Sequence, residues 1–327
     1  GSVLHSKNRE WWSRMPLLQP KVPKTEKWGK NPVDRFILQK LRAHELSPGS
    51  VASPSVLIRR LTYDLTGLPP SPSEISAFKK EYGSDPDHAY EELVDRLLSS
   101  PRYGERFARH WLDVAKYADT CGYDKDKLRP HAWPYRDYVI RSFNQDKPYA
   151  QFVKEQIAGD FIYPDTEDGI LGLGFLAAGP WDFIGHVEVP ESKTDGKVAR
   201  NLDRDDMVSN VFNSFCATTI QCARCHEHKG DPIGQDHYYS LQSVFAAVDK
   251  ADRIYGLDPK VARKKEQLSI REGTLAREVA LAEKELKKKG AGELKKLNDR
   301  LSKLQKSDGF ATRVPEHGYH SQIVQRP

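Results

Sequence analysis

Residues 101–119 read PRYGERFARHWLDVAKYAD and predict an α-helix. Their apolar residues recur at steps of three and four, which places them on one face of a helix. Comparable patterns occupy residues 31–46, 53–68, 71–83, 85–100, the region near 135–143, and residues 149–158. Two of these begin on start signals, Ser53-Pro54 and Ser71-Pro72. We therefore expect a mainly α protein, an irregular multi-helix domain.

Composition narrows the class of protein. Hydrophobic residues make up 38% and charged residues 30% of the 327 positions, and no run of about 18 apolar residues occurs. The net charge of +5 is mild, and many of the lysines gather between Lys284 and Lys306, as on a solvated helix face. A nucleic-acid partner would need a basic stripe with interleaved aromatic residues. We expect neither a membrane span nor nucleic-acid binding.

The chain divides into four expected segments. Residues 1–30 form an extended lead-in, in which Gly1-Ser2 is typical of a cleaved tag, and residues 31–257 form the helical domain. Residues 258–307 predict an antiparallel coiled-coil hairpin, a spacer or docking arm, because apolar residues recur there at steps of three and four on both sides of a Gly-Ala-Gly turn. Residues 308–327 resemble a linker toward a further domain. Within the helical domain, residues 161–203 are Gly- and Pro-rich and predict a buried loop.

The sequence Cys222-Ala-Arg-Cys225-His226 is the attachment pattern of a c-type haem. Two thiols three residues apart can each add to one vinyl group of the haem edge and form thioethers. The adjacent imidazole then lies under the iron as its proximal ligand. We expect one covalent haem c, attached through Cys222 and Cys225, with His226 on the iron.

Two other uses of the motif compete with the haem interpretation. A structural zinc site normally needs a second pair of ligands, which Cys121, Cys216 and His228 could supply. A thioredoxin-like redox pair needs a βαβ context, and the helical pattern around residues 222–225 offers none. The haem is the preferred interpretation.

The sixth iron ligand is left between two candidates. Met15 lies in the lead-in and Met207 on the run-up to the motif, so methionine ligation is not expected. Cys121 ranks first, because a thiolate would stabilise ferric iron and lower the potential. The alternative use of Cys121 is a disulfide with Cys216. His110 ranks second, and its alternative is a buried histidine satisfied by a hydrogen bond.

Further residues are candidates for the haem environment. Arg136 and Tyr135 could bind haem propionates, since such groups give charge-assisted hydrogen bonds. Surface ion pairing, with Asp137 for example, is the alternative for Arg136. His228 follows the proximal ligand by two residues and is the weakest candidate for the distal position, because its backbone leaves on the proximal side.

Long stretches of the chain carry a family resemblance. They are NPVDRFILQKL (31–41), LIRRLTYDLTGLPPSPSEISAF (57–78), LVDRLLSSPRYGERFARHWLDVAKYADT (93–120), AWPYRDYVIRSFNQDKPYAQFVKEQIAGD (132–160) and CARCHEHKGDPIGQDHYYSLQSVFA (222–246). In these the chain resembles planctomycete cytochrome-type proteins, in particular the large domain of unknown function that usually follows a cytochrome c domain. The resemblance implies export to the periplasm or cell surface, with a signal peptide removed, and a larger parent protein. Cys121 departs from the Asn, Asp or Ser that is usual at its position.

The expected function is electron transfer at low redox potential by a six-coordinate haem. The partner would be a redox protein or the neighbouring cytochrome domain of the same parent chain. The first alternative is a haem enzyme or a gas or redox sensor with a displaceable sixth ligand, and the second is a zinc-bearing structural module. Whether the protein is an enzyme is left open, with an electron-transfer domain preferred over a catalyst.

Overall fold

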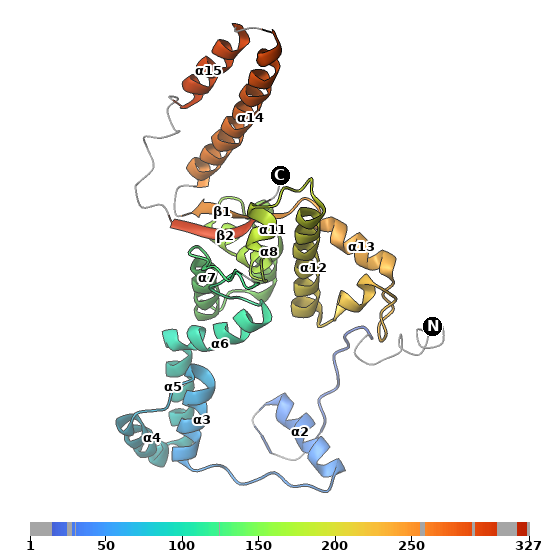
Figure 1. Cartoon of the computed structure of the whole chain (residues 1–327). Helices are drawn as coiled ribbons and strands as arrows, with labels where there is room; N and C mark the ends of the chain where they lie inside the picture. Colours follow the sequence, from blue (N-terminus) through green and yellow to red (C-terminus); the bar gives the residue numbers. More distant parts are fainter. Residues whose placement is uncertain are drawn as a thin grey trace. The chain divides into compact units, whose positions relative to one another are not determined.

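The computed structural model describes residues 15–24, 28–29, 31–123, 125–255, 259–289, 292–305 and 319–325. Within these ranges the chain is mainly helical, as predicted (Figure 1). It divides into a first unit, Gly1–Tyr103 with Cys225–Gln235, and a second unit, Gly104–Arg224 with Asp236–Pro327. No helix in the described part of the chain is long and apolar enough to cross a membrane.

The first unit carries four helices in its described N-terminal part. They are α2 (Pro32–Ala43), α3 (Pro54–Thr66), α4 (Pro72–Ser84) and α5 (Pro86–Leu98). Each begins with proline, which suits the first helical turn because its missing N–H would have no partner there. Asn31 and Ser71 form capping boxes at the starts of α2 and α4. Gly67 ends α3 in the left-handed conformation, with φ of 73°.

Helices α3, α4 and α5 share one small core. Its buried members are Ile58, Phe78, Ala89, Leu93 and Leu97. Burying each of the larger side chains contributes about 1.5–3 kcal/mol. The apolar residues that recur at steps of three and four in the sequence therefore form the inward face of these three helices.

The second unit contains the longer part of the fold. Its helices are α6 (Pro101–Val114, of which the last eleven residues belong here), α7 (Trp133–Asn144), α8 (Tyr149–Ile162), α9 (Glu167–Leu171), α10 (Gly174–Ala177), α11 (Phe183–Val187), α12 (Thr194–Cys216), the 3₁₀ helix η2 (Ile220–Arg224) and α13 (Gln235–Val244). Aromatic rings join them, with Trp111 of α6 in contact with Phe152, Phe175 and Phe215. The Trp111 ring nitrogen donates to Gln156 Oε1 over 2.8 Å, which satisfies this polar atom inside the core.

A buried ionic network joins α7, α8 and α9. Lys147 Nζ lies 2.5 Å from Glu155 Oε2 and 2.7 Å from Asp168 Oδ2. The Tyr138 hydroxyl donates to Glu155 Oε2 over 2.7 Å, and Arg141 pairs with Asp168. Because every charge in this network has a partner, its burial is tolerated. The network fixes the start of the Gly- and Pro-rich segment.

The sequence predicts a buried loop over residues 161–203, and the structure shows short helices there. The segment is buried over much of 169–179, as predicted, but it is built from the short helices α9, α10 and α11. Gly159 and Gly169 permit their close packing, because a Cβ on Gly159 would lie 2.2 Å from the Gly169 carbonyl oxygen. Helix α12 also begins earlier than the pattern suggested, at Thr194 instead of near Asp205.

A two-stranded sheet and a helical pair complete the second unit. Strand β1 (Asp249–Tyr255) pairs antiparallel with β2 (Tyr319–Gln325), so that Asp249 lies opposite Gln325. The predicted linker over 308–327 is thus a strand at 319–325, and its other residues lie outside the described ones. Helices α14 (Pro259–Lys289) and α15 (Gly292–Gln305) come between β1 and β2 in the sequence. The two helices lie side by side (Figure 1). Their coiled-coil packing stays a prediction, since several of the leucines carrying the pattern lie outside the described side chains.

Candidate functional site

Cys222 lies on a short turn that follows α12. Helix α12 ends at Cys216, and Ala217 reverses the chain in the left-handed conformation, with φ of 50°. Helix η2 follows, and its Ile220 and Ala223 are fully buried. Residues three apart share a face of a 3₁₀ helix, so these two side chains bury together. Cys222, between them, is left exposed.

The end of this turn is anchored to α12 by a buried carboxylate. Arg224 Nη1 donates to Asp205 Oδ2 over 2.7 Å, and the Tyr238 hydroxyl of α13 donates to Asp205 Oδ1. The Tyr239 hydroxyl donates to the carbonyl oxygen of Arg224 over 3.2 Å. Burial raises the pKa of Tyr238, and the bond to Asp205 raises it further. Asp205 therefore holds both η2 and α13 on one face of α12.

Cys225 and His226 follow directly and are also exposed. His226 Nδ1 lies 2.7 Å from the Glu227 carbonyl oxygen. A carbonyl oxygen only accepts, so this contact places the ring proton on Nδ1 and leaves the lone pair on Nε2. Metal-binding histidines commonly donate their second ring nitrogen to a backbone carbonyl in this way. His226 thus presents the tautomer that an iron ligand requires.

His228 is engaged by its own loop. It is buried, and its Nδ1 accepts hydrogen bonds from the backbone N–H groups of Asp231, at 2.8 Å, and Gly230, at 3.2 Å. The Asp231 carboxylate also lies 3.2 Å from Nδ1, but the backbone donors already occupy that lone pair. The hydrogen-bond pattern therefore places the ring proton on Nε2. A role for His228 beside a haem stays a prediction.

A family model described as PSCyt2, a protein of unknown function (DUF1549), matches residues 32–250. The chain belongs to the PSCyt2 family. No curated protein and no solved structure matches it. The matched residues run from α2 into β1 and include the Cys222–His226 motif, whereas the helical pair α14–α15 lies outside them.

Within the PSCyt2 chain, Cys121 is buried in the loop between α6 and α7. Its backbone N–H donates to the Lys127 carbonyl, and its carbonyl accepts from Trp181 N, both over 2.8 Å. Its thiol lies near the Arg129 guanidinium and acts to raise the pKa of that group. The thiol is free, and so is the exposed Cys216, so the disulfide considered for these two cysteines is not formed in this structure.

Arg129 is a buried cation whose guanidinium donates hydrogen bonds to backbone carbonyl oxygens. Its guanidinium donates to the carbonyl oxygens of Ala178, at 3.0 Å, and Gly179, at 2.9 Å, where α10 ends. Burial lowers the pKa of Arg129, while the neighbouring Cys121 and Asp203 act against that shift. Arginine remains charged under such conditions. The loop that holds Cys121 is thereby fixed to the segment that follows α10.

Asp203 of α12 is the centre of a second buried group of charges. Lys250 Nζ lies 3.3 Å from Asp203 Oδ1, and His186 Nε2 lies 2.8 Å from Asp203 Oδ2. His186 Nδ1 donates to the Asp182 carbonyl oxygen over 2.7 Å. Burial opposes protonation of His186, but the hydrogen bond and charge of Asp203 outweigh it and raise the pKa of His186. Burial lowers the pKa of Lys250, again against the pull of Asp203.

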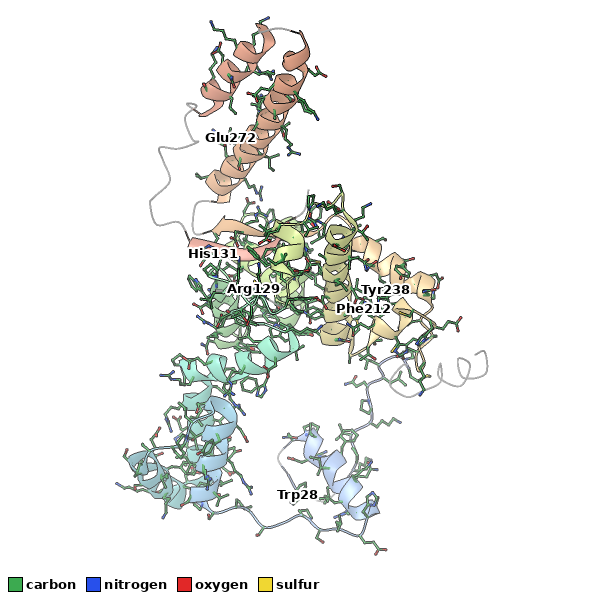
Figure 2. The ribbon with its side chains drawn as sticks, in the orientation of Figure 1. Trp28, Arg129, His131, Phe212, Tyr238 and Glu272 are labelled. Carbon is green, nitrogen blue, oxygen red and sulfur yellow. The ribbon has the colours of Figure 1, made fainter. Side chains whose placement is uncertain are left out.

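The two charge groups lie on different faces of α12. Asp205 faces Arg224 and Tyr238, whereas Asp203 faces the side where Arg129 lies. Figure 2 shows Arg129 and Tyr238 on opposite sides of α12. A helix with its side chains is about 10 Å across. The structure therefore does not bring Cys121 together with Cys222.

His110 is exposed on α6. Its ring contacts Phe107 edge-on at a centroid distance of 6.3 Å. The next residue, Trp111, packs against Phe215 near the end of α12 that leads into η2. The alternative of a buried, satisfied histidine is wrong for His110, while its role as an iron ligand stays a prediction.

Two residues proposed for the haem environment have other partners. Tyr135 is buried, and its hydroxyl donates to Gln156 Oε1 over 2.7 Å. Arg136 places Nε and Nη2 each 3.0 Å from Asp137 Oδ1, the surface ion pair considered as its alternative. Binding of propionates by either residue stays a prediction.

Among the residues that the structure describes, no group of three or more His, Cys, Asp and Glu side chains is arranged to hold a metal ion. The zinc alternative needs such a group, because structural zinc takes four protein ligands. A haem iron differs, since the porphyrin supplies four ligands and the protein adds one or two. The haem and the zinc alternative therefore both stay predictions at this point.

Proposed function

We propose that this PSCyt2 chain is a c-type cytochrome domain that binds one covalent haem at Cys222, Cys225 and His226 and transfers electrons. The observation that carries the proposal is the state of these three side chains. Both thiols are free and exposed, and they precede an exposed imidazole whose Nε2 lone pair is available. A bound haem would supply one-electron redox chemistry.

The chemistry of attachment suits an exposed turn. Each thiol adds across a vinyl double bond, with sulfur on one carbon and hydrogen on the other, and no oxidant is consumed. The covalent links retain the cofactor without a deep pocket. The contacts of Arg224 and Tyr238 with the buried Asp205 carboxylate hold the Cys222 turn in place during this reaction.

For the sixth position, the surroundings of the two candidates differ. The His110 ring is exposed, so it could approach a haem iron without rearrangement of the core. The Cys121 thiol is buried beside Arg129 and would have to leave that contact, on the other face of α12 from Arg224. We therefore place His110 first, which reverses the order expected from the sequence. The expectation of a low potential depends on the thiolate and belongs to Cys121 alone.

The cellular setting proposed from the resemblance is an exported planctomycete cytochrome-type protein. Electrons would pass between this domain and a redox partner protein, or a cytochrome domain of the same parent chain. This setting is consistent with haem attachment in the periplasm or at the cell surface.

The test is covalent haem retention after export with a c-type haem maturation system. The wild-type chain should keep a haem stain on a denaturing gel and give a pyridine haemochrome spectrum. The double variant Cys222→Ala/Cys225→Ala should lose both signals, while the matched control Cys216→Ala, also an exposed cysteine, should keep them.

Two outcomes would redirect the proposal. A folded, colourless, zinc-loaded product under these conditions would support the zinc-bearing module. With haem attached, a rapid and complete Soret shift on adding carbon monoxide to the reduced protein would indicate a displaceable sixth ligand. That result would favour a haem enzyme or sensor over electron transfer.

A further inference from the structure

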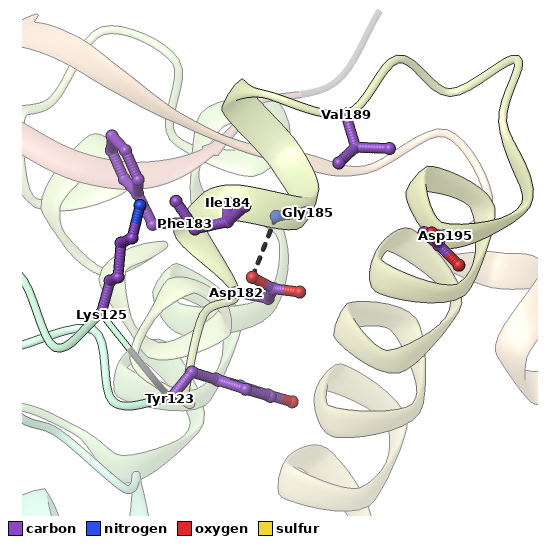
Figure 3. A pocket seen from close by; sticks show the side chains of 8 residues that line it. All are labelled: Tyr123, Lys125, Asp182, Phe183, Ile184, Gly185, Val189 and Asp195. Atoms are coloured by element: carbon purple, nitrogen blue, oxygen red, sulfur yellow. Dashed lines mark hydrogen bonds between the residues drawn. The ribbon is translucent and has the colours of Figure 1, made fainter.

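The second unit contains an open pocket of about 410 Å³ that lies apart from the Cys222 turn (Figure 3). It is formed by the loop after Cys121, by α11 with the segment that follows it, and by the start of α12. Small-molecule sites typically have volumes of about 300–1,000 Å³ and combine an apolar lining with a few polar groups. This pocket has the size and the composition of such a site.

The apolar part of the lining comes from α11 and the residues near it. Phe183, Ile184 and Val189 line the pocket, together with the ring of Tyr123. Lys127 Nζ lies 3.9 Å from the centroid of the Phe183 ring. That contact shows an aromatic wall of the pocket already carrying a cation on one face, as ring quadrupoles favour.

The pocket contains carboxylate and hydroxyl oxygens that could bind a ligand. Among the described residues, neither the Asp195 carboxylate nor the Tyr123 hydroxyl has a hydrogen-bond or ion-pair partner. Asp182 Oδ1 accepts from Gly185 N over 2.9 Å, which leaves Oδ2 for a ligand. Figure 3 shows the Asp182 carboxylate on the side of the pocket toward α12, which carries Asp195.

Three carboxylates lie close enough to Tyr123 to affect its ionisation. Burial raises the pKa of Tyr123, and the charges of Asp206, Asp182 and Asp203 raise it further. The same charges that disfavour a phenolate favour a positive ligand beside the hydroxyl. Tyr123 also holds a positive φ of 62°, a conformation that costs a side chain of this size about 1–2 kcal/mol. The surrounding structure maintains that strain and directs the ring across the pocket toward α12 (Figure 3).

We propose that this pocket binds an organic cation, an ammonium group attached to an apolar body. The ammonium lies with Asp182 and Asp195 and near the Tyr123 hydroxyl, and the apolar body packs on Phe183 and Val189. Lys125 lines the pocket beside Phe183, away from Asp195 (Figure 3), so a second positive charge on the ligand is disfavoured. The site stands on its own geometry and is independent of the proposed haem.

The test measures binding of three probes of similar size to the whole chain by isothermal titration calorimetry. They are 2-phenylethylammonium, the neutral 2-phenylethanol and the anionic 3-phenylpropanoate. We expect the ammonium to bind at least tenfold more tightly than the alcohol, and the carboxylate to bind least. Saturable binding of the ammonium that is no tighter than that of the alcohol, stronger binding of the carboxylate, or no binding of any probe up to millimolar concentration would overturn the proposal.

Variants assign the selectivity to the two carboxylates. Asp182→Asn removes the charge but keeps a good helix cap, and Asp195→Asn removes an exposed charge, so neither change should unfold the chain. Each should weaken ammonium binding about tenfold and leave the alcohol unaffected. The matched control Asp113→Asn, an exposed carboxylate on α6, should change nothing. Unchanged ammonium binding in the double variant, with a wild-type circular dichroism spectrum, would also refute the site.

Discussion

The replacement Asp205→Ala tests the anchoring of the Cys222 turn. Asp205 joins three elements, because its two carboxylate oxygens accept from Arg224 of η2 and from Tyr238 of α13 while its backbone belongs to α12. Alanine removes both acceptors and leaves the helix intact. The loss should therefore appear in the stability of the second unit and in the retention of haem.

The magnitude follows from the burial of the two donors. Tyr238 is fully buried, so its hydroxyl loses its acceptor without access to water, at a cost of about 1–3 kcal/mol. The Arg224 side chain is 41% exposed, and an ion pair at such a site contributes about 0.2–1 kcal/mol. The sum is about 1–4 kcal/mol. For a unit of this size, at about 3 °C per kcal/mol, that corresponds to a fall in Tm of roughly 3–12 °C.

The assay is thermal unfolding followed by circular dichroism at 222 nm, with two partner variants. Arg224→Ala should cost less than about 1 kcal/mol, since its side chain is half in water. Tyr238→Phe should cost about 1–2 kcal/mol, because the carboxylate keeps its bond to Arg224. An Asp205→Ala cost below 0.5 kcal/mol, or one matched by Arg224→Ala alone, would refute the assignment of the energy to the buried hydroxyl.

Three other changes have expected outcomes. Lys147→Met should destabilise the chain by about 3–5 kcal/mol in urea unfolding, because the buried Glu155 carboxylate loses its charged partner; a near-neutral result would contradict a charged network. The pKa of His186 is raised in the folded state, so its stabilising contribution is complete below the unfolded pKa near 6.5 and is lost as the pH rises through the folded pKa. Stability measured between pH 5 and 9 should therefore fall toward alkaline pH in the wild type and less so in His186→Gln, and identical profiles would exclude the histidine. In the haem-loaded protein, His110→Ala should change the visible and electron paramagnetic resonance spectra and Cys121→Ala should not, and the reverse pattern would restore the thiolate as the sixth ligand.

The helices were predictable where their signals are local. Asn31 and Ser71 cap α2 and α4 through contacts three residues away, and the leucines of α5 recur at helical spacing. The start of α12 is not predicted, because Val198, Ala199 and Leu202 are the only apolar side chains in the otherwise polar stretch 194–204. Their helix is held by close tertiary packing, in which a Cβ on Gly196 would lie 2.4 Å from the Pro190 carbonyl oxygen.

The buried charges and the strand pair were not predictable from local pattern. Arg129 and Lys250 lie far from Asp203 in the sequence, and nothing in their neighbours distinguishes them from surface residues. Strand β1 pairs with residues that follow an intervening helical pair, so its partner cannot be recognised from spacing. For the candidate site, the motif itself was visible in five residues. The anchoring by Asp205 and the pocket at Asp182 depend on the tertiary fold.

One turn of α12 carries two carboxylates that bind different parts of the second unit. Asp203 and Asp205 are two residues apart. Asp203 pairs with Lys250 and His186, whereas Asp205 binds Arg224 in the turn that carries Cys222. A substitution that reshapes one face leaves the other face's contacts in place, whereas a helix-breaking residue at this turn removes both. The two activities proposed for this chain can therefore be separated genetically, one face at a time, in a single protein.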